Sequence, residues 1–92
     1  MTRVRWTTNA ADDLERIVNY IRRDSPDAAL RVAKTIFDGV AELRTFPNRG
    51  RIGLVQGTRE LVFARWPYIA VYEIIDDQVQ VLRIRHSSQN WH

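Results

Sequence analysis

The C-terminal half of the chain contains side chains that could do acid–base chemistry on a phosphate ester. His86 can exchange a proton near neutral pH, and Glu60 or Glu73 could act as a base. Arg51 or Arg85 could hold a phosphate through paired N–H donors. Structural roles are the alternative for each acid–base group. The histidine could hydrogen-bond the backbone of the C-terminal tail, and both glutamates could lie on a solvated rim.

The basic residues are distinctive in type, because only Lys34 among the 14 is a lysine, and the net charge is +3. Arginine presents a planar fork of donors and stacks on bases, whereas lysine is a point charge. This composition favours an anionic or nucleic-acid-like target. Codon usage in a high-GC genome is the alternative explanation for so much arginine.

The length of 92 residues predicts one domain, residues 1–92. The chain has no cysteine, which excludes disulfides and cysteine-based zinc sites. It has no run of about 18 apolar residues that could span a membrane. Residues 1–6 lack the apolar core of a signal peptide. We therefore expect a cytoplasmic protein with no metal, no cofactor and no membrane partner.

Hydrophobic periodicity predicts the secondary structure in chain order. Alternating apolar residues predict strands over 2–6, 59–65, 68–75 and 79–86. One helix follows the cap-type residues 7–9, and a second, over about 27–45, begins after Ser25-Pro26. The order β-α-α-β-β-β predicts an α+β fold, with a helical hairpin packed on a small antiparallel sheet.

The last three strands allow the faces of the sheet to be predicted. Two-residue turns at Trp66-Pro67 and Asp76-Asp77 would pair Arg65 with Tyr68 and Ile75 with Gln78. One face then carries Leu61, Phe63, Ala70, Tyr72, Ile74, Val79 and Val81, with Arg59, Arg65, Arg83 and Arg85 among them. The other face carries Val62, Ala64, Ile69, Val71, Leu82 and Ile84, with Glu60, Glu73, Gln80 and His86 around them.

We assign the two helices to the first face because its side chains are larger. The second face would then be an apolar surface rimmed by polar groups, which a soluble monomer seldom leaves bare. This pattern predicts a surface for a partner protein. The alternative is that the tail or the loop over residues 46–58 folds across it.

Several segments in fixed order resemble the ParE branch of the RelE/ParE toxins of type II toxin–antitoxin systems. The matching segments are residues 46–51 (FPNRGR), 57–62 (GTRELV), 67–72 (PYIAVY), 81–86 (VLRIRH) and 90–91 (NW). The first helix also matches, through Ala11, Asp12, Leu14, Ile17, Tyr20 and Ile21. The resemblance implies a helical hairpin on a small antiparallel sheet, and a cognate antitoxin, ParD-like or another small one, that wraps the toxin.

Two activities are known in this superfamily. RelE-type members cleave mRNA on the ribosome, whereas ParE-type members poison DNA gyrase and catalyse no reaction. The RelE-type arginine positions fall on Ile69 and Gln89 here, so both cations are missing. The resemblance therefore implies a gyrase poison, encoded in a plasmid-stabilisation module, that is not an enzyme. An mRNA endoribonuclease and a non-toxic family member remain the alternatives.

Three sets of residues follow from this interpretation. The predicted target contacts are Arg49, Arg51, Arg59, Arg85, His86 and Trp91. The predicted antitoxin contacts are Val62, Ile69, Val71, Leu82 and Ile84. Arg83 is expected to form a structural ion pair with Asp12, or else with Asp13 or Glu15, and a target contact is the alternative. Arg59 could instead anchor the 46–58 loop through backbone carbonyls, and Trp91 could instead cap the edge of the core.

Overall fold

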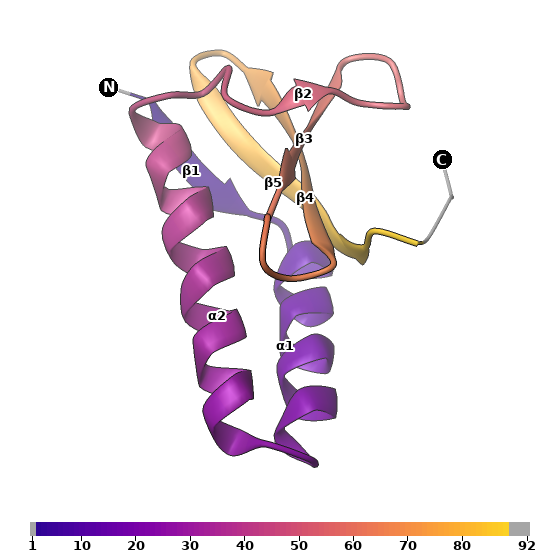
Figure 1. Cartoon of the computed structure of the whole chain (residues 1–92). Helices are drawn as coiled ribbons and strands as arrows, with labels where there is room; N and C mark the ends of the chain where they lie inside the picture. The colour runs from indigo at the N-terminus through magenta and orange to yellow at the C-terminus, as the bar shows by residue number, and fades with distance from the viewer. Residues whose placement is uncertain (1, 89–92) are drawn as a thin grey trace.

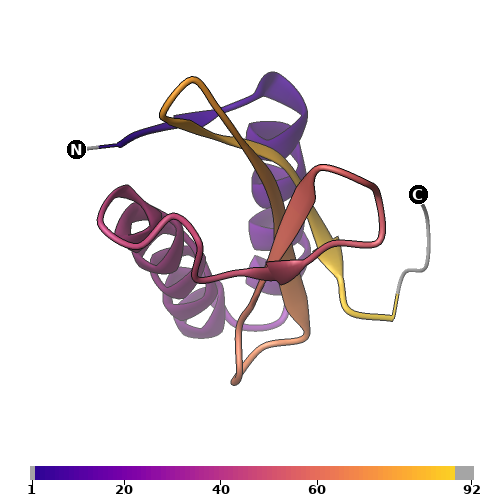
Figure 2. The same cartoon turned by 90° about the horizontal axis from the view of Figure 1, so that it is seen from above.

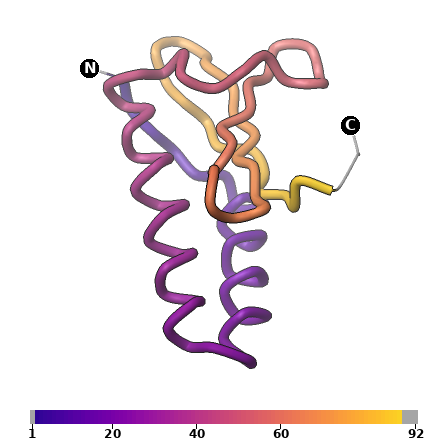
Figure 3. Tube along the Cα trace, viewed as in Figure 1, coloured from indigo at the N-terminus to yellow at the C-terminus, as the bar shows by residue number. Residues whose placement is uncertain are grey.

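The computed structural model of the chain describes residues 2–88. Its elements are β1 (Arg3–Trp6), α1 (Thr8–Arg22), α2 (Pro26–Ala41), the 3-10 helix η1 (Glu42–Arg44), β2 (Arg51–Ile52), β3 (Thr58–Val62), β4 (Tyr68–Ile75) and β5 (Gln78–His86). The two helices form a hairpin, and the strands lie together in a sheet across one end of it (Figures 1 and 3). The predicted α+β class and helical hairpin are confirmed.

The five-stranded sheet has the order β1-β5-β4-β3-β2, and its strands twist across one another (Figure 2). β1 pairs with β5 in parallel, whereas the other pairs are antiparallel. The predicted antiparallel sheet is thus confirmed for β2 to β5, and the parallel pairing of β1 makes the whole sheet mixed. Parallel neighbours need a long crossover, and the helical hairpin with the intervening strands provides it. The 46–58 loop also contains β2, a short edge strand that the hydrophobic pattern was too short to reveal.

Both helices begin at the predicted caps. The Thr7 hydroxyl accepts a hydrogen bond from the backbone N–H of Ala10 at 3.2 Å and donates to the Val81 carbonyl at 2.8 Å. The Ser25 hydroxyl accepts from the N–H of Ala28 at 3.1 Å, and a proline occupies the first helical turn. These caps satisfy backbone donors at the helix ends, and the first of them also ties α1 to β5.

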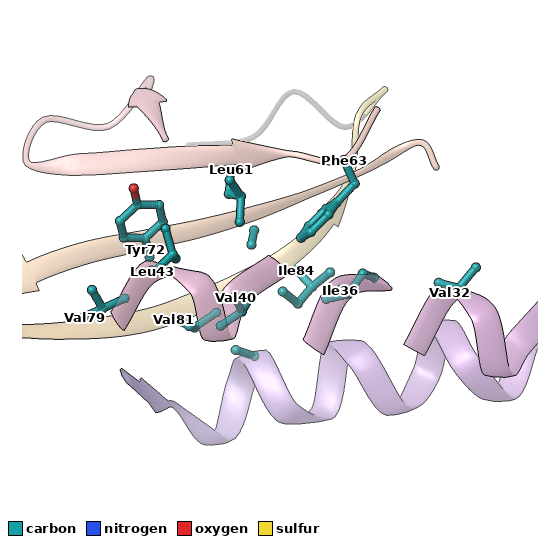
Figure 4. Close-up of a cluster of buried hydrophobic side chains, with 12 residues drawn as sticks. Val32, Ile36, Val40, Leu43, Leu61, Phe63, Tyr72, Val79, Val81 and Ile84 are labelled. Atoms are coloured by element: carbon teal, nitrogen blue, oxygen red, sulfur yellow. The ribbon is translucent and has the colours of Figure 1, made fainter. Parts of the chain in front are cut away.

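The core lies between α2 and the sheet. Figure 4 shows Leu61, Phe63 and Tyr72 of the sheet side packed towards side chains of α2 and η1. The members of this core cluster from α2 and η1 are Val32, Ile36, Val40 and Leu43. The predicted helix-covered face is thus confirmed at Leu61, Phe63, Ala70, Tyr72, Val79 and Val81, whereas Ile74 is exposed.

The two hairpin turns differ in how well the sequence predicted them. Asp76 and Asp77 have φ of 51° and 60°, and Ile75 pairs with Gln78 as predicted. The β3–β4 register was predicted with an error of two residues. Val62 pairs with Ile69, and residues 63–67 form a longer loop than the predicted two-residue turn. An even shift leaves each side chain on its predicted face, since strands alternate with a period of two.

A β-bulge in β5 changes the second half of that strand. Val71 pairs with Arg83 and Tyr72 with Val81, so Leu82 is an extra residue. The extra residue reverses the alternation beyond it. Ile84 therefore packs into the helix-covered core instead of the opposite face. Arg85 correspondingly lies on the face of Glu60, the reverse of the prediction.

Candidate functional site

Asp13 is the buried acceptor that joins α1 to β5. Its carboxylate accepts from Arg83 Nε at 2.7 Å, from Arg83 Nη2 at 3.0 Å and from the backbone N–H of Ile84 at 3.0 Å. Arg16, one turn further along α1, also donates to it at 2.7 Å. Burial alone would raise the pKa of Asp13, but these donors outweigh burial and hold its pKa below the usual value.

The predicted ion pair of Arg83 is therefore present with a different partner. The prediction named Asp12 first, with Asp13 and Glu15 as alternatives, and the structure places Asp13 against Arg83. Asp12 is exposed one position further round the helix. Helical spacing predicts which face of a helix is buried, but it does not decide between two neighbouring residues at the edge of that face. The orientation of α1 against the sheet decides that Asp13, and not Asp12, meets Arg83.

A cleft of about 210 Å³ lies beside this ion pair. Its walls are formed by Asp13, Arg16, Ile17, Tyr68, Arg83, Ile84 and His86. The ring of Tyr68 meets the ring of His86 edge to face, with centroids 5.6 Å apart. His86 Nδ1 accepts from the backbone N–H of Ser88 at 3.1 Å. His86 therefore lines this cleft, on the face of the sheet that α1 covers.

Glu60 lies on the opposite face of the sheet, in a second ionic cluster. Arg51 Nη2 contacts its carboxylate at 2.9 Å and Arg85 Nη2 at 3.2 Å. The side chains of Glu60 and Arg85 are each 5% exposed. Burial raises the pKa of Glu60, but hydrogen bonds from both arginines outweigh it and lower that pKa. The predicted face shared by Glu60 and His86 is wrong, since the bulge separates them.

The 46–58 loop is fastened to the sheet by polar contacts. Arg59 donates to the carbonyls of Asn48 at 3.3 Å and Gly50 at 2.7 Å. The buried Tyr72 hydroxyl accepts from the Gly50 N–H at 2.8 Å and donates to the Pro47 carbonyl at 2.7 Å. The alternative role of Arg59, anchoring this loop, is the one that the structure shows. No sequence pattern predicted the part played by Tyr72.

The other predicted target contacts fall into three groups. Arg49 and Arg51 are exposed, and Arg49 contacts Glu42 while Arg51 contacts Glu60. Arg85 is buried in its ion pair, so its predicted role as a surface contact is wrong. Trp91, like Gln89, lies outside the described residues.

The predicted antitoxin surface is only partly open. Val62 is 48% exposed, and Val71 and Leu82 are half-buried. Ile69 is 2% exposed and Ile84 is 3% exposed, so neither forms the open apolar surface that was predicted. The charged pair of Glu60 and Arg85 occupies the same face. This face is therefore more polar and more closed than the alternation of residues suggested.

An open apolar surface lies where β1 meets the two helices. Trp6 and Phe37 stack there with centroids 6.3 Å apart, and Phe37 is 58% exposed. Two adjoining grooves, of about 390 Å³ and about 350 Å³, share these two rings. Their other apolar lining residues are Val4, Ala11, Leu14, Val18 and Ala41. The buried face of α2 is formed by Val32, Ile36 and Val40, and Phe37 lies outside it.

Within residues 2–88, no group of three or more histidine and carboxylate side chains is placed to hold a metal ion. Neither helix in this part of the chain is long and apolar enough to cross a membrane. The candidate sites are therefore the two ionic clusters, the cleft beside Asp13 and the apolar grooves.

Comparison with known proteins gives the family. Residues 4–91 match the model of the ParE toxin of the type II toxin–antitoxin system parDE. The chain belongs to the ParE toxin family. It is 45% identical to the Y4kP protein of Sinorhizobium fredii over 97% of this chain and 92% of that one. It is 41% identical to toxin RelE2 of Caulobacter vibrioides over 97% and 99% of the two chains.

Solved structures agree with this assignment to the ParE family. A chain from the chromosomal ParDE system of P. aeruginosa superposes with a TM-score of 0.84 at 34% identity, over 94% of this chain and 96% of that one. The RelBE2 complex of Mycobacterium tuberculosis gives 0.56 at 28% identity, over 92% and 96%. The E. coli RelBE complex, at 13% identity and a TM-score of 0.62, shares the fold. The protein is thus a toxin of a type II toxin–antitoxin system, and such toxins are found in complex with a cognate antitoxin.

Proposed function

We propose that this ParE-family toxin poisons DNA gyrase as a binding protein and catalyses no reaction. The observation that supports this proposal most is that Glu60 is buried and has a lowered pKa. A general base should have a pKa near the working pH and reach its substrate. Two arginine side chains lower the pKa of Glu60 instead, and its side chain is 5% exposed.

The surroundings of Glu60 also favour binding over RNA cleavage. Ile69, at the position where RelE-type toxins have an arginine, is buried and apolar. It cannot supply the cation that stabilises a pentacovalent phosphorus. His86 lies in the cleft on the other face of the sheet, so it is not placed beside Glu60 as an acid for that base.

The proposed contact with gyrase is the outer surface of the 46–58 loop. This loop exposes Phe46, Ile52 and Leu54, three large apolar side chains beside the exposed Arg49 and Arg51. Apolar anchors beside arginine are typical of protein interfaces. The contacts of Arg59 and Tyr72 with the base of the loop hold it in one conformation for binding.

Purified gyrase, supercoiled plasmid and the toxin test the proposal. We expect linear DNA after detergent and protease treatment, because a poison traps the cleaved intermediate. Arg49→Gln should reduce the yield, whereas Arg31→Gln, the same change on the exposed surface of α2, should not. Loss of specific transcripts on induction, with gyrase unaffected, would instead establish an mRNA endoribonuclease. If induction leaves growth unchanged, the chain is a non-toxic member.

We propose that the antitoxin occupies the grooves around Trp6 and Phe37. An amphipathic helix could lay its apolar face along them, because they form an exposed apolar surface beside the β1 edge of the sheet. Phe37→Asp should weaken antitoxin binding in a titration, because the bound antitoxin would bury the new carboxylate away from water. Phe46→Asp is the matched control on an equally exposed phenylalanine. If Val62→Asp weakens antitoxin binding and Phe37→Asp does not, the antitoxin occupies the predicted sheet face instead of the grooves.

A further inference from the structure

The cleft between α1 and the ends of β4 and β5 has a positively charged wall fixed by a buried acid. Arg16 and Arg83 both donate to Asp13, so two guanidinium groups share one carboxylate. The carboxylate uses one N–H group of Arg16, and an arginine has five such donors. The side chain of Arg16 is 71% exposed. Asp13 therefore holds the Arg16 guanidinium beside the cleft while most of its donors face outward.

Tyr68 provides a third donor from the opposite wall. Tyr68 lines the cleft, and within residues 2–88 its hydroxyl forms no hydrogen bond with the protein. Burial, and then the neighbouring Tyr20, raise the pKa of Tyr68, so its hydroxyl stays protonated and able to donate. The ring packs edge to face with His86, which fixes the direction of that hydroxyl. The cleft thus combines donors from α1, β4 and β5.

Size and donor geometry identify the class of ligand. The cleft has a volume of about 210 Å³. Ligands of drug size need about 300–1,000 Å³. The cleft therefore suits one phosphate group, with any sugar and base outside it. A tetrahedral phosphate can take donors from three elements at once, whereas a planar carboxylate matches a single guanidinium fork.

We propose that this cleft binds a backbone phosphate of single-stranded nucleic acid. Arg16 and Tyr68 donate to the phosphate oxygens, Arg83 supplies positive charge, and Asp13 acts as a positioning residue that orients both arginines. The exposed Tyr20, one helical turn beyond Arg16, offers a ring on which an adjacent base could stack. This inference goes beyond gyrase poisoning, because it gives the toxin a nucleic-acid contact of its own.

Fluorescence anisotropy with labelled 12-nucleotide strands, one of DNA and one of RNA, tests the proposal. Arg16→Gln keeps the Asp13–Arg83 pair and should weaken binding about tenfold, because charge-assisted hydrogen bonds are the stronger ones. Tyr68→Phe keeps the ring and should weaken binding about threefold. Arg31→Gln removes the same charge from the exposed surface of α2 and should have little effect.

A second measurement places the phosphate in the cleft. The amide N–H of Ile84 donates to Asp13 at the base of the site. Inorganic phosphate should shift its NMR resonance in the wild-type protein and much less in Arg16→Gln. The slope of log affinity against log salt should also fall by about 0.7 in that variant, as expected for one phosphate contact on a single strand. Thermal unfolding of the variants should match the wild type, which separates lost binding from lost folding.

Three results would overturn the proposal. Equal weakening by Arg16→Gln and Arg31→Gln would mean that binding is general surface electrostatics. Absence of saturable binding by both strands would mean that the cleft does not take a phosphate. Stronger binding of a polyglutamate peptide, lost in Arg16→Gln, would identify an acidic protein segment as the ligand. Gyrase is absent from all these assays, so their failure leaves the proposed gyrase poisoning untouched.

Discussion

Replacing Asp13 with asparagine should destabilise the fold substantially, although only one oxygen becomes an amide nitrogen. The carboxylate accepts from Arg83 twice, from the Ile84 N–H and from Arg16. Asparagine keeps one acceptor oxygen but turns an NH₂ group towards the same donors. At least one of the two contacts with Arg83 is therefore lost, together with the charge.

The contacts set the magnitude. A hydrogen bond to a charged group contributes about 1.5–3 kcal/mol, and at least one is removed. The Arg83 side chain is 41% exposed, so water can partly solvate its guanidinium after the Asp13 carboxylate is lost. This keeps the loss below the roughly 3–5 kcal/mol typical of breaking a fully buried pair. We expect a decrease of about 2 kcal/mol in the free energy of unfolding.

Urea unfolding followed by circular dichroism measures this loss, with Asp12→Asn as the exposed control. The pKa of Asp13 is lower in the folded protein than its ordinary value of 3.8. Its stabilising contribution is therefore fully present above that value and is lost as the pH falls through the lower, folded pKa. The gap between wild type and Asp13→Asn should be constant near neutral pH and shrink below about pH 4. Equal stability of the Asp12 and Asp13 variants at pH 7 would refute this reasoning.

Two further substitutions test the other face and the loop. Glu60→Gln should cost about 3 kcal/mol in urea unfolding, because it removes the carboxylate charge that contacts both the buried Arg85 and Arg51; an effect no larger than that of Glu73→Gln would contradict the assigned ion pair. Tyr72→Phe should cost about 1–3 kcal/mol, because it leaves the buried N–H of Gly50 without its acceptor. Its 46–58 loop should also become more sensitive to protease, and unchanged cleavage would show that the hydroxyl does not hold the loop.

The local features of the chain could be predicted from the residues because their causes are local. Thr7, and Ser25 followed by Pro26, cap the helices through contacts only three residues away. Asp76 and Asp77 tolerate the positive φ of a tight turn, which fixed the β4–β5 register at its beginning. An alternation of period two marked the core face, and it survived a two-residue error in the neighbouring turn.

The candidate sites depended on contacts between residues far apart in the sequence. One extra residue, Leu82, reversed the end of β5, and no local pattern marks a bulge. That reversal buried Ile84, paired Arg85 with Glu60 and carried His86 to the cleft. An alternating pattern assigns faces only while the register holds, so every residue after an unmarked insertion is assigned to the wrong side.

The partner of Arg83 also depended partly on the sequence and partly on the tertiary structure. The sequence predicted an acid on the first helix, because a buried guanidinium requires a counter-charge. Asp12 and Asp13 both meet that requirement, and the sequence does not distinguish between them. The choice between them followed from how α1 lies against β5, which is set by packing along the whole helix. Residue types thus fixed which interactions the protein must make, and the packed arrangement of helix and sheet fixed which residues make them.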